Sequence, residues 1–268
     1  MKSNIFFPII LTTVTEFACT PKSNSPTKLE ISTTSIEYKQ DGKDFEGYIS
    51  FPKSNAKLPA VLVIHEWGGL NEYTKSRADQ LAQLGYFAFA MDMYGKGIRA
   101  KDHKEASELS GVYGKDRKLM RGRIAQAIKT LRARPEIDTS KIAIIGYCFG
   151  GLAAIEHALT GEALNGIMVF HAGLILPTIA TDAGKIKSPI VIHHGGDDNF
   201  IQKKDIDLLK TSFDKNKVNY EFIVHPGAKH GFTNKFNIGH EGHGLEYNEI
   251  ADKASWKSLE EKLKIWFK

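Results

Sequence analysis

The sequence predicts an α/β fold in which a mostly parallel β-sheet is covered by helices on both faces. Short apolar runs such as Ile142 to Ile145 are typical of strands that are buried on both sides, as in a parallel sheet. These runs alternate along the chain with amphipathic segments such as Lys115 to Arg134, whose apolar residues share one helical face. In such folds the function lies at the carboxyl ends of the strands, so a site is expected there.

The folded part is expected to begin with a β-hairpin at the antiparallel edge of the sheet. Two alternating runs, Ser35 to Tyr38 and Phe45 to Phe51, flank the turn Gln40-Asp41-Gly42-Lys43. Asp-Gly is a favoured pair for a two-residue hairpin turn, because both positions require a positive φ.

Strands and helices then alternate to the end of the chain. The predicted strands cover Pro59 to His65, Tyr86 to Met91, Ile142 to Ile145, Gly166 to His171, Pro189 to His194 and Tyr220 to Val224. The predicted helices cover Glu72 to Leu84, Lys115 to Arg134, Phe149 to Leu159, Lys203 to Asn216 and Ser255 to Phe267. Gly85 ends the first helix and Pro135 the second, while Leu174 to Asp182 is expected to form a loop or a short helix.

The N-terminus is separable from the predicted fold. Residues 1–19 resemble a bacterial lipoprotein signal, because Lys2 precedes an apolar run, Ile5 to Val14, that ends shortly before Cys19. Residues 20–34 form a polar tether, and residues 35–268 form a single domain. The expected product is an exported protein, periplasmic or anchored to a membrane through lipidated Cys19. Ordinary secretion and an uncleaved anchor remain the alternatives, since Glu16 stands where such a signal usually has an apolar residue.

Composition excludes several other classes of function. The formal charge of +5 comes from scattered lysines without a basic block, which argues against nucleic-acid binding. The two cysteines lie in dissimilar segments, which argues against a disulfide framework. Neither the adjacent pair His193 and His194 nor the loop pair His240 and His243 has the helical spacing of a two-histidine zinc site, so no metal and no cofactor are predicted. The sequence does not indicate an oligomeric state.

The segment Gly146-Tyr147-Cys148-Phe149-Gly150 has the spacing of a nucleophile elbow, with cysteine in place of serine. A tight strand-to-helix turn requires flanking residues without a β-carbon, and it places the central side chain near a helix N-terminus, where the helix dipole favours a thiolate. The alternative is a structural cysteine in an ordinary turn. The pentapeptide alone does not decide between them.

Further polar residues follow other predicted strands. Glu66, then Asp197 or Asp198, and then His230 each come at a strand end, so that the chain order after Cys148 is nucleophile, acid, histidine. A histidine can take the thiol proton, and an aspartate on its other ring nitrogen can fix the tautomer. The backbone N–H groups of Phe149 and Trp67 are the candidates for an oxyanion hole.

Five ordered motifs carry a specific resemblance. They are H-E-W-G-G-L-N, M-D-M-Y-G, G-Y-C-F-G-G, H-G-G-D-D-N-F-I and G-A-K-H-G-F-T-N, and together they resemble the dienelactone hydrolase family of α/β-hydrolases from about Ser35 to the C-terminus. The resemblance implies an α/β-hydrolase fold with Cys148 as nucleophile, Asp198 as acid and His230 as base. It also implies that Glu66 receives the thiol proton when substrate arrives, which would leave the resting thiol latent.

The predicted function is therefore that of a carboxymethylenebutenolidase-like hydrolase: cysteine-dependent hydrolysis of small esters or lactones through an acyl-thioenzyme. Asn234 and Tyr94 are the candidate substrate-binding residues. Asn234 stands where the dienelactone-cleaving enzymes have a carboxylate-binding arginine, and Arg99 and Arg117 are candidates for a second such arginine, so neutral substrates are expected. A non-catalytic surface lipoprotein that uses the fold for binding is the alternative, while the lack of a C-x-x-C motif argues against a thiol redox protein.

Overall fold

The computed structural model describes Met1, residues 28–237 and residues 244–268. The predicted signal segment with Cys19, the tether as far as residue 27 and the pair His240 and His243 lie outside the described residues. In the part of the chain that is described, no helix is both long and apolar enough to cross a membrane.

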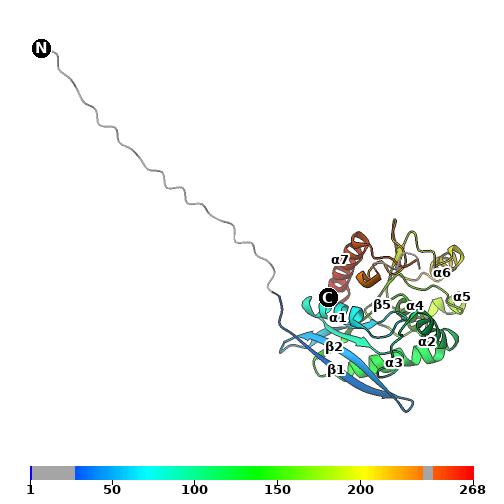
Figure 1. Ribbon diagram of the computed structural model, residues 1–268, viewed down its shortest axis with the longest axis horizontal. Coiled ribbons are helices and arrows are strands. Elements are labelled where there is room, and N and C mark those ends of the chain that lie inside the picture. The colour runs from blue at the N-terminus through cyan, green and yellow to red at the C-terminus, as the bar shows by residue number, and fades with distance from the viewer. Residues whose placement is uncertain (2–27, 238–243) are drawn as a thin grey trace.

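The described residues form an eight-stranded sheet with helices on both faces, which confirms the predicted α/β-hydrolase fold (Figure 1). The strands are β1 (Ile31–Gln40), β2 (Lys43–Pro52), β3 (Leu58–Ile64), β4 (Phe87–Met91), β5 (Ile137–Tyr147), β6 (Gly166–Phe170), β7 (Ile190–Gly195) and β8 (Tyr220–His225). The α-helices are α1 (Glu72–Gln83), α2 (His103–Lys115), α3 (Arg117–Arg132), α4 (Phe149–Ala158), α5 (Ile179–Asp182), α6 (Lys203–Lys215) and α7 (Glu249–Trp266).

The strand order is β1-β2-β4-β3-β5-β6-β7-β8. β1 and β2 pair antiparallel, β2 also pairs antiparallel with β4, and the remaining neighbours are parallel. The hairpin turn has φ values of 50° at Asp41 and 73° at Gly42, as the Asp-Gly pair predicted. Figure 1 shows the hairpin as a long ribbon along one edge of the sheet.

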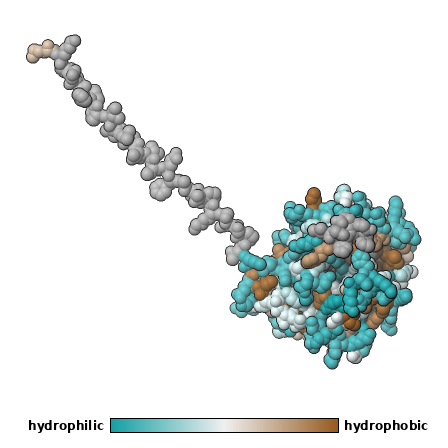
Figure 2. Space-filling model, viewed as in Figure 1, coloured by the Kyte–Doolittle hydropathy of each residue, from teal (hydrophilic) through white to brown (hydrophobic). Residues whose placement is uncertain are grey.

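Two hydrophobic layers bury the sheet. Along β3 the side chains alternate, so that Leu62 and Ile64 join the layer under α3, α4 and α6, whereas Val61 and Val63 join the layer under α1 and α7. This explains why β3 reads as a continuous apolar run in the sequence. The face seen in Figure 2 is mostly hydrophilic, with apolar side chains in small separate groups.

One helix of the structure is absent from the predictions. Helix α2 was not predicted: Ala106 and Tyr113 are its buried residues, and Gly111 and Gly114 lower its helix propensity. Its start is fixed by Asp102, whose side chain accepts a 2.8 Å hydrogen bond from the Glu105 N–H.

Three further elements extend beyond their predicted ends. β1 begins at Ile31, so residues 31–34 belong to the sheet and not to the tether. β5 begins at Ile137, before a shift in its register with β3. α7 begins at Glu249, where the Asn248 side chain caps it by accepting a hydrogen bond from the Ala251 N–H.

Candidate active site

Cys148 lies on the tight turn between β5 and α4. Its φ of 53° and ψ of −114° form a backbone conformation that costs a non-glycine residue about 1–3 kcal/mol. The flanking glycines allow this turn to close: a Cβ on Gly146 would lie 2.2 Å from the Gly150 carbonyl oxygen, and one on Gly150 would lie 2.3 Å from that of Ile64. The Cys148 N–H donates a 3.0 Å hydrogen bond to the Phe170 carbonyl, which fixes the turn to β6.

The loops after β7 and β8 bring two polar side chains to Cys148. His230 Nε2 lies 3.0 Å from Cys148 Sγ, and His230 Nδ1 lies 2.8 Å from Asp198 Oδ2. The other oxygen of Asp198 accepts a 2.9 Å hydrogen bond from the Phe200 N–H. Asp198 and His230 are both buried, whereas Cys148 at the end of this hydrogen-bonded line is only partly buried.

The structure distinguishes the two neighbouring aspartates. Asp197 is exposed, whereas Asp198 is buried and contacts His230. The backbone N–H of Asp197 donates to the Ala228 carbonyl, and a Cβ on Gly195 would lie only 2.5 Å from that same oxygen. The glycine thus lets the loop before His230 approach the turn that carries Asp198.

The charges around His230 favour its protonated form. Burial by itself lowers the pKa of His230, but the Cys148 sulfur and the Asp198 carboxylate outweigh it and raise that pKa to about 10. An imidazolium at His230 places a positive charge 3.0 Å from the Cys148 sulfur. The resemblance implied a latent resting thiol that loses its proton to Glu66 when substrate arrives, and in this conformation Sγ is hydrogen-bonded to His230.

Glu66 lies in the loop after β3 and is buried. Its Oε2 accepts a 2.7 Å hydrogen bond from the Asn234 side-chain amide. Burial raises the pKa of Glu66, while Asn234, His230 and Arg77 oppose that rise. Among the described residues Glu66 is hydrogen-bonded to Asn234 and not to Cys148. It is therefore not part of the hydrogen-bonded line formed by Cys148, His230 and Asp198.

His65 fixes the backbone next to Glu66. Its Nε2 accepts a 3.2 Å hydrogen bond from the Met93 N–H, so its Nδ1 carries the proton and donates to the Glu66 carbonyl at 2.5 Å. Burial lowers the pKa of His65 to about 4, which keeps the ring neutral. This role was missed in the sequence, where His65 was only the last residue of a strand.

The two candidate oxyanion donors lie on either side of Cys148. Phe149 is the first residue of α4, where the helix dipole points its positive end outward, and Trp67 lies in the loop after β3. In the described part of the chain neither backbone N–H has a hydrogen-bond partner. The Trp67 carbonyl is held by the Tyr94 hydroxyl at 2.8 Å, which orients that peptide.

A pocket of about 220 Å³ opens over Cys148. Its lining is mainly apolar, and among the described residues no lysine or arginine contributes to it. The lining residues are Trp67, Ser110, Cys148, Phe149, Leu152, Gly173, Leu174, Ile175, Phe200, Ile201, Asp205 and His230. Such a lining suits a small, uncharged ligand.

Four residues expected to bind substrate lie elsewhere. Asn234 is buried on Glu66, and Tyr94 supports the Trp67 carbonyl, so neither lines the pocket. Arg99 donates to the Leu70 and Ile98 carbonyls. Arg117 donates to the carbonyl of Ile175, a pocket-lining residue, at 2.9 Å. The two arginines are already bound to the protein's own oxygens.

The histidines of β7 and β8 do not form a metal site in the described chain. His193 Nδ1 lies 2.9 Å from His225 Nε2, and burial lowers the pKa of His193 to about 3. Nowhere among residues 28–237 and 244–268 do three His, Cys, Asp or Glu side chains gather as metal ligands would.

Residues 45–267 match the dienelactone hydrolase family. The chain belongs to this family. The match covers most of β2, the elbow and the loops that carry Asp198 and His230, so the resemblance seen in the five motifs extends over most of the described domain.

Similar proteins and structures agree with the family assignment. A protein of Aquifex aeolicus, provisionally named carboxymethylenebutenolidase, is 33% identical over 207 residues, which cover 75% of this chain and 87% of that protein. A protein of Methylorubrum extorquens with the same provisional name is 28% identical over 239 residues, covering 85% of this chain and 78% of that one. The crystal structure of a dienelactone hydrolase-like promiscuous phosphotriesterase from metagenomic libraries superposes with a TM-score of 0.85 at 33% identity, over 89% of this chain and 99% of that one.

Proposed function

We propose that this dienelactone hydrolase family member is a cysteine-dependent hydrolase of small, neutral esters or lactones that acts through an acyl-thioenzyme. The observation that carries the proposal is the hydrogen-bonded line from Cys148 Sγ through His230 to Asp198, with separations of 3.0 and 2.8 Å. A protein that used the fold only for binding would have no need of a nucleophile, a base and an acid in this arrangement.

The first half-reaction would transfer the acyl group to sulfur. The Cys148 thiolate attacks the carbonyl carbon, a C–S bond forms, and the carbonyl electrons move to oxygen. The Phe149 and Trp67 N–H groups would stabilise that oxyanion. When the intermediate collapses, the C–O bond to the leaving group breaks and His230 donates its proton to the departing alkoxide. In a lactone the leaving oxygen stays attached to the acyl chain.

The second half-reaction would release the acid. Neutral His230 takes a proton from water, the resulting hydroxide attacks the thioester carbonyl, and the C–S bond breaks to regenerate the thiolate. Asp198 keeps the same ring nitrogen of His230 facing the sulfur throughout and stabilises the imidazolium in each half-reaction. The substrate and one water molecule are the only reactants that this balance requires besides the protein.

Glu66 would act as a proton reservoir behind the nucleophile. It is buried and its pKa is raised, so it can hold a proton near neutral pH more readily than an exposed glutamate. The family resemblance assigns it the thiol proton. Its hydrogen bond to Asn234 keeps one carboxylate oxygen fixed while the other remains available.

The substrate class follows from the pocket. Its volume of about 220 Å³ and its apolar lining favour a short acyl or lactone ring without charge. Asp205 is the acidic residue on the lining, and it would repel a carboxylate further.

The decisive experiment follows hydrolysis of short-chain aryl esters and simple lactones by the full-length protein and by its Cys148→Ala and His230→Ala variants. Each variant should lose on the order of a thousandfold or more in kcat, and the double variant should lose no more than the worse single one. Mass spectrometry under rapid quenching should find the acyl group on Cys148. Near-normal hydrolysis by Cys148→Ala would disprove the mechanism, and no hydrolysis of any ester or lactone by wild type would favour the binding-protein alternative.

We also propose that the protein is exported and held at a membrane by a lipid on Cys19. The apolar run before Cys19 and the polar residues after it support this proposal. Mass spectrometry of the mature N-terminus tests it. Finding Met1 there, or cleavage anywhere other than before Cys19, would refute lipidation.

A further inference from the structure

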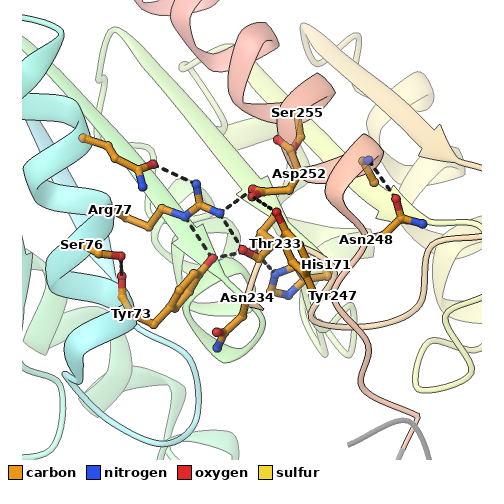
Figure 3. A network of polar contacts seen from close by, with 12 residues as sticks. Tyr73, Ser76, Arg77, His171, Thr233, Asn234, Tyr247, Asn248, Asp252 and Ser255 are labelled. Carbon is orange, nitrogen blue, oxygen red and sulfur yellow. Dashed lines mark hydrogen bonds and ion pairs between the residues drawn. The ribbon is translucent and has the colours of Figure 1, made fainter. Parts of the chain in front are cut away.

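A buried network of hydrogen bonds lies beneath the loop that carries His230 (Figure 3). Its centre is Arg77 on α1, whose side chain is only 6% exposed. One guanidinium nitrogen of Arg77 donates to the Thr233 carbonyl oxygen at 2.6 Å and to Asp252 on α7. The guanidinium carbon also lies 5.1 Å from the centre of the Trp256 ring. Arg77 therefore connects α1, α7 and the loop through one side chain.

Thr233 is also held through its side chain. Thr233 Oγ1 lies 2.5 Å from the Tyr73 hydroxyl and 2.8 Å from His171 Nε2. The Tyr73 hydroxyl in turn accepts a hydrogen bond from Arg77 Nε. As Figure 3 shows, Tyr73, Arg77 and His171 converge on Thr233 from different sides. Both the backbone and the side chain of this one threonine are thus fixed.

Thr233 occupies a position from which it can control the reacting groups. It lies three residues after His230 and directly before Asn234, whose amide binds Glu66. His171, its hydrogen-bond partner, packs against His230 with ring centres 5.3 Å apart. A displacement of Thr233 would consequently reach the base through the backbone and through His171, and it would reach Glu66 through Asn234.

The network also separates two hollows. His230 lines the pocket over Cys148, whereas Tyr73, Arg77 and Thr233 line a second cavity of about 270 Å³ between α1 and α7. His171 and Thr233 are 0% and 1% exposed, so water cannot replace a hydrogen bond that is lost there.

The charges along the network suit the proposed chemistry. Burial, followed by the nearby positive charges of His230 and Arg77, lowers the pKa of His171 well below its usual value, so this ring stays neutral. A neutral ring beside His230 does not compete for its proton or repel its imidazolium form. The positive charge of Arg77 also favours the carboxylate form of Glu66.

We propose that Tyr73, Arg77 and Thr233 are positioning residues that hold His230 in line with Cys148 and hold Asn234 on Glu66. The inference rests on the proposed function, because it assigns a task to residues that touch neither the substrate nor the reacting sulfur. Of these three, Tyr73 and Thr233 offer the cleanest tests, since each can lose its hydroxyl with little change in shape.

The experiment compares Tyr73→Phe, Thr233→Val and their double variant with Tyr48→Phe in the full-length protein. Tyr48 is a matched control because its hydroxyl also bonds to a residue of α1, Asp79 at 2.8 Å, but that contact leads away from the site. Two quantities are measured: kcat for an ester substrate, and the pH dependence of Cys148 alkylation by iodoacetamide, with the modified peptide identified by mass spectrometry. The second needs no substrate.

Each single variant is expected to lower kcat by about threefold to tenfold, as the loss of one buried hydrogen bond would. The pH of half-maximal alkylation should rise by about 0.5–1 unit, because a displaced His230 stabilises the thiolate less well. The double variant should lose no more than the worse single one, because both hydroxyls hold the same threonine. Tyr48→Phe should match wild type in both measurements. Titratable groups around His230 that shape this profile are Cys148, Asp198, Glu66, His171 and His194.

A purely structural role would lower the thermal midpoint and leave the alkylation profile of the folded protein unchanged, and that result would overturn the proposal. Equal kcat and equal profiles in Tyr73→Phe, Thr233→Val and wild type would overturn it too. Failure of the proposed function looks different: Cys148→Ala would retain ester hydrolysis, whatever the two hydroxyl variants do to the alkylation profile.

Discussion

The side-chain amide of Asn234 donates a 2.7 Å hydrogen bond to Glu66 Oε2, and both side chains are buried. The residue four positions after His230 is therefore directed at a second acid and not at the substrate pocket. This contact links the loop after β8 to the loop after β3. It gives Asn234 a function that the sequence, which presents it only as a missing arginine, did not indicate.

The contact leads to a prediction for Asn234→Asp. A second carboxylate beside Glu66 removes the hydrogen bond and, as a like charge, raises the pKa of Glu66 further. The carboxylate form is then present only at higher pH, so the acidic limb of the kcat profile should move upward. Loss of a hydrogen bond to a charged group should also lower kcat at pH 7 by about tenfold to a hundredfold.

The matched control for this variant is Asn216→Asp, since the Asn216 amide bonds to the Ser212 carbonyl at the end of α6, away from the site. Steady-state kinetics between pH 5 and 9 would compare the two. An acidic limb that stays in place in Asn234→Asp would show that Glu66 does not take part in the pH dependence.

A second prediction concerns the proton on His230. The Cys148 thiolate is the largest of the contributions that raise the pKa of His230 against the opposing effect of burial, so Cys148→Ala should lower that pKa from about 10. Between this lowered pKa and about 10, the His230 ring of the variant is neutral while the wild-type ring keeps its charge. NMR titration of ¹⁵N-labelled imidazoles in both proteins measures the shift. An unchanged pKa would mean that the sulfur is not ionised beside the ring.

The elbow allows a prediction about stability. A Cβ on Gly150 would lie 2.3 Å from the Ile64 carbonyl oxygen and 2.6 Å from that of His65, and backbone atoms cannot move aside cheaply. Gly150→Ala should therefore destabilise the protein by more than about 3 kcal/mol, at the upper end of single substitutions. Gly111→Ala is the control, because nothing lies within 4 Å of its added Cβ and it sits in α2.

In the helix interior the control substitution should stabilise by about 0.5–1 kcal/mol. Urea unfolding, followed by circular dichroism, measures both changes. Equal unfolding midpoints for Gly150→Ala and wild type would show that the elbow can relax, and that Gly150 is not required for the turn.

The sequence predicted the elements that have strong local signals. The elbow glycines at 146 and 150, the Asp-Gly turn and the buried strands each follow from a few adjacent residues, and the structure places them as expected. Helix α2 was not predicted because its sequence contains two glycines, Gly111 and Gly114, and buries only Ala106 and Tyr113. Glycines and polar residues in one segment are also typical of a solvated loop.

The contacts between distant segments could not be predicted. Tyr73 and Thr233 meet across 160 residues of chain, and neither belongs to a local pattern that indicates a partner. The residue pattern alone left Asp197 and Asp198 open, and the family resemblance selected Asp198. In the structure the close approach of residues 195 and 228 accompanies the inward turn of Asp198. Motif order placed the candidate residues at one edge of the sheet, but tertiary packing decided which of them touch.

The last prediction concerns the charge of the substrate. The pocket over Cys148 contains no described lysine or arginine, and Arg99 and Arg117 are bound to backbone carbonyls. A buried carboxylate without a cation loses its hydration and gains no charge-assisted hydrogen bond in return. Wild type should therefore hydrolyse a neutral ester with a higher kcat/KM than a matched ester that carries a carboxylate, by about tenfold to a hundredfold.

The preference for a neutral ester can be changed at Ile175. Ile175 lines the pocket and is 68% exposed, so an arginine there can reach the pocket mouth without being buried, whereas Asn234→Arg would be directed at Glu66. Ile175→Arg should shift the ratio of kcat/KM values towards the carboxylated ester, and Ile175→Gln, which adds a polar group without charge, should not. Steady-state kinetics with the matched ester pair measures both ratios. A wild-type preference for the carboxylated ester would contradict the prediction, because it would require a cation that this pocket does not supply from the described residues.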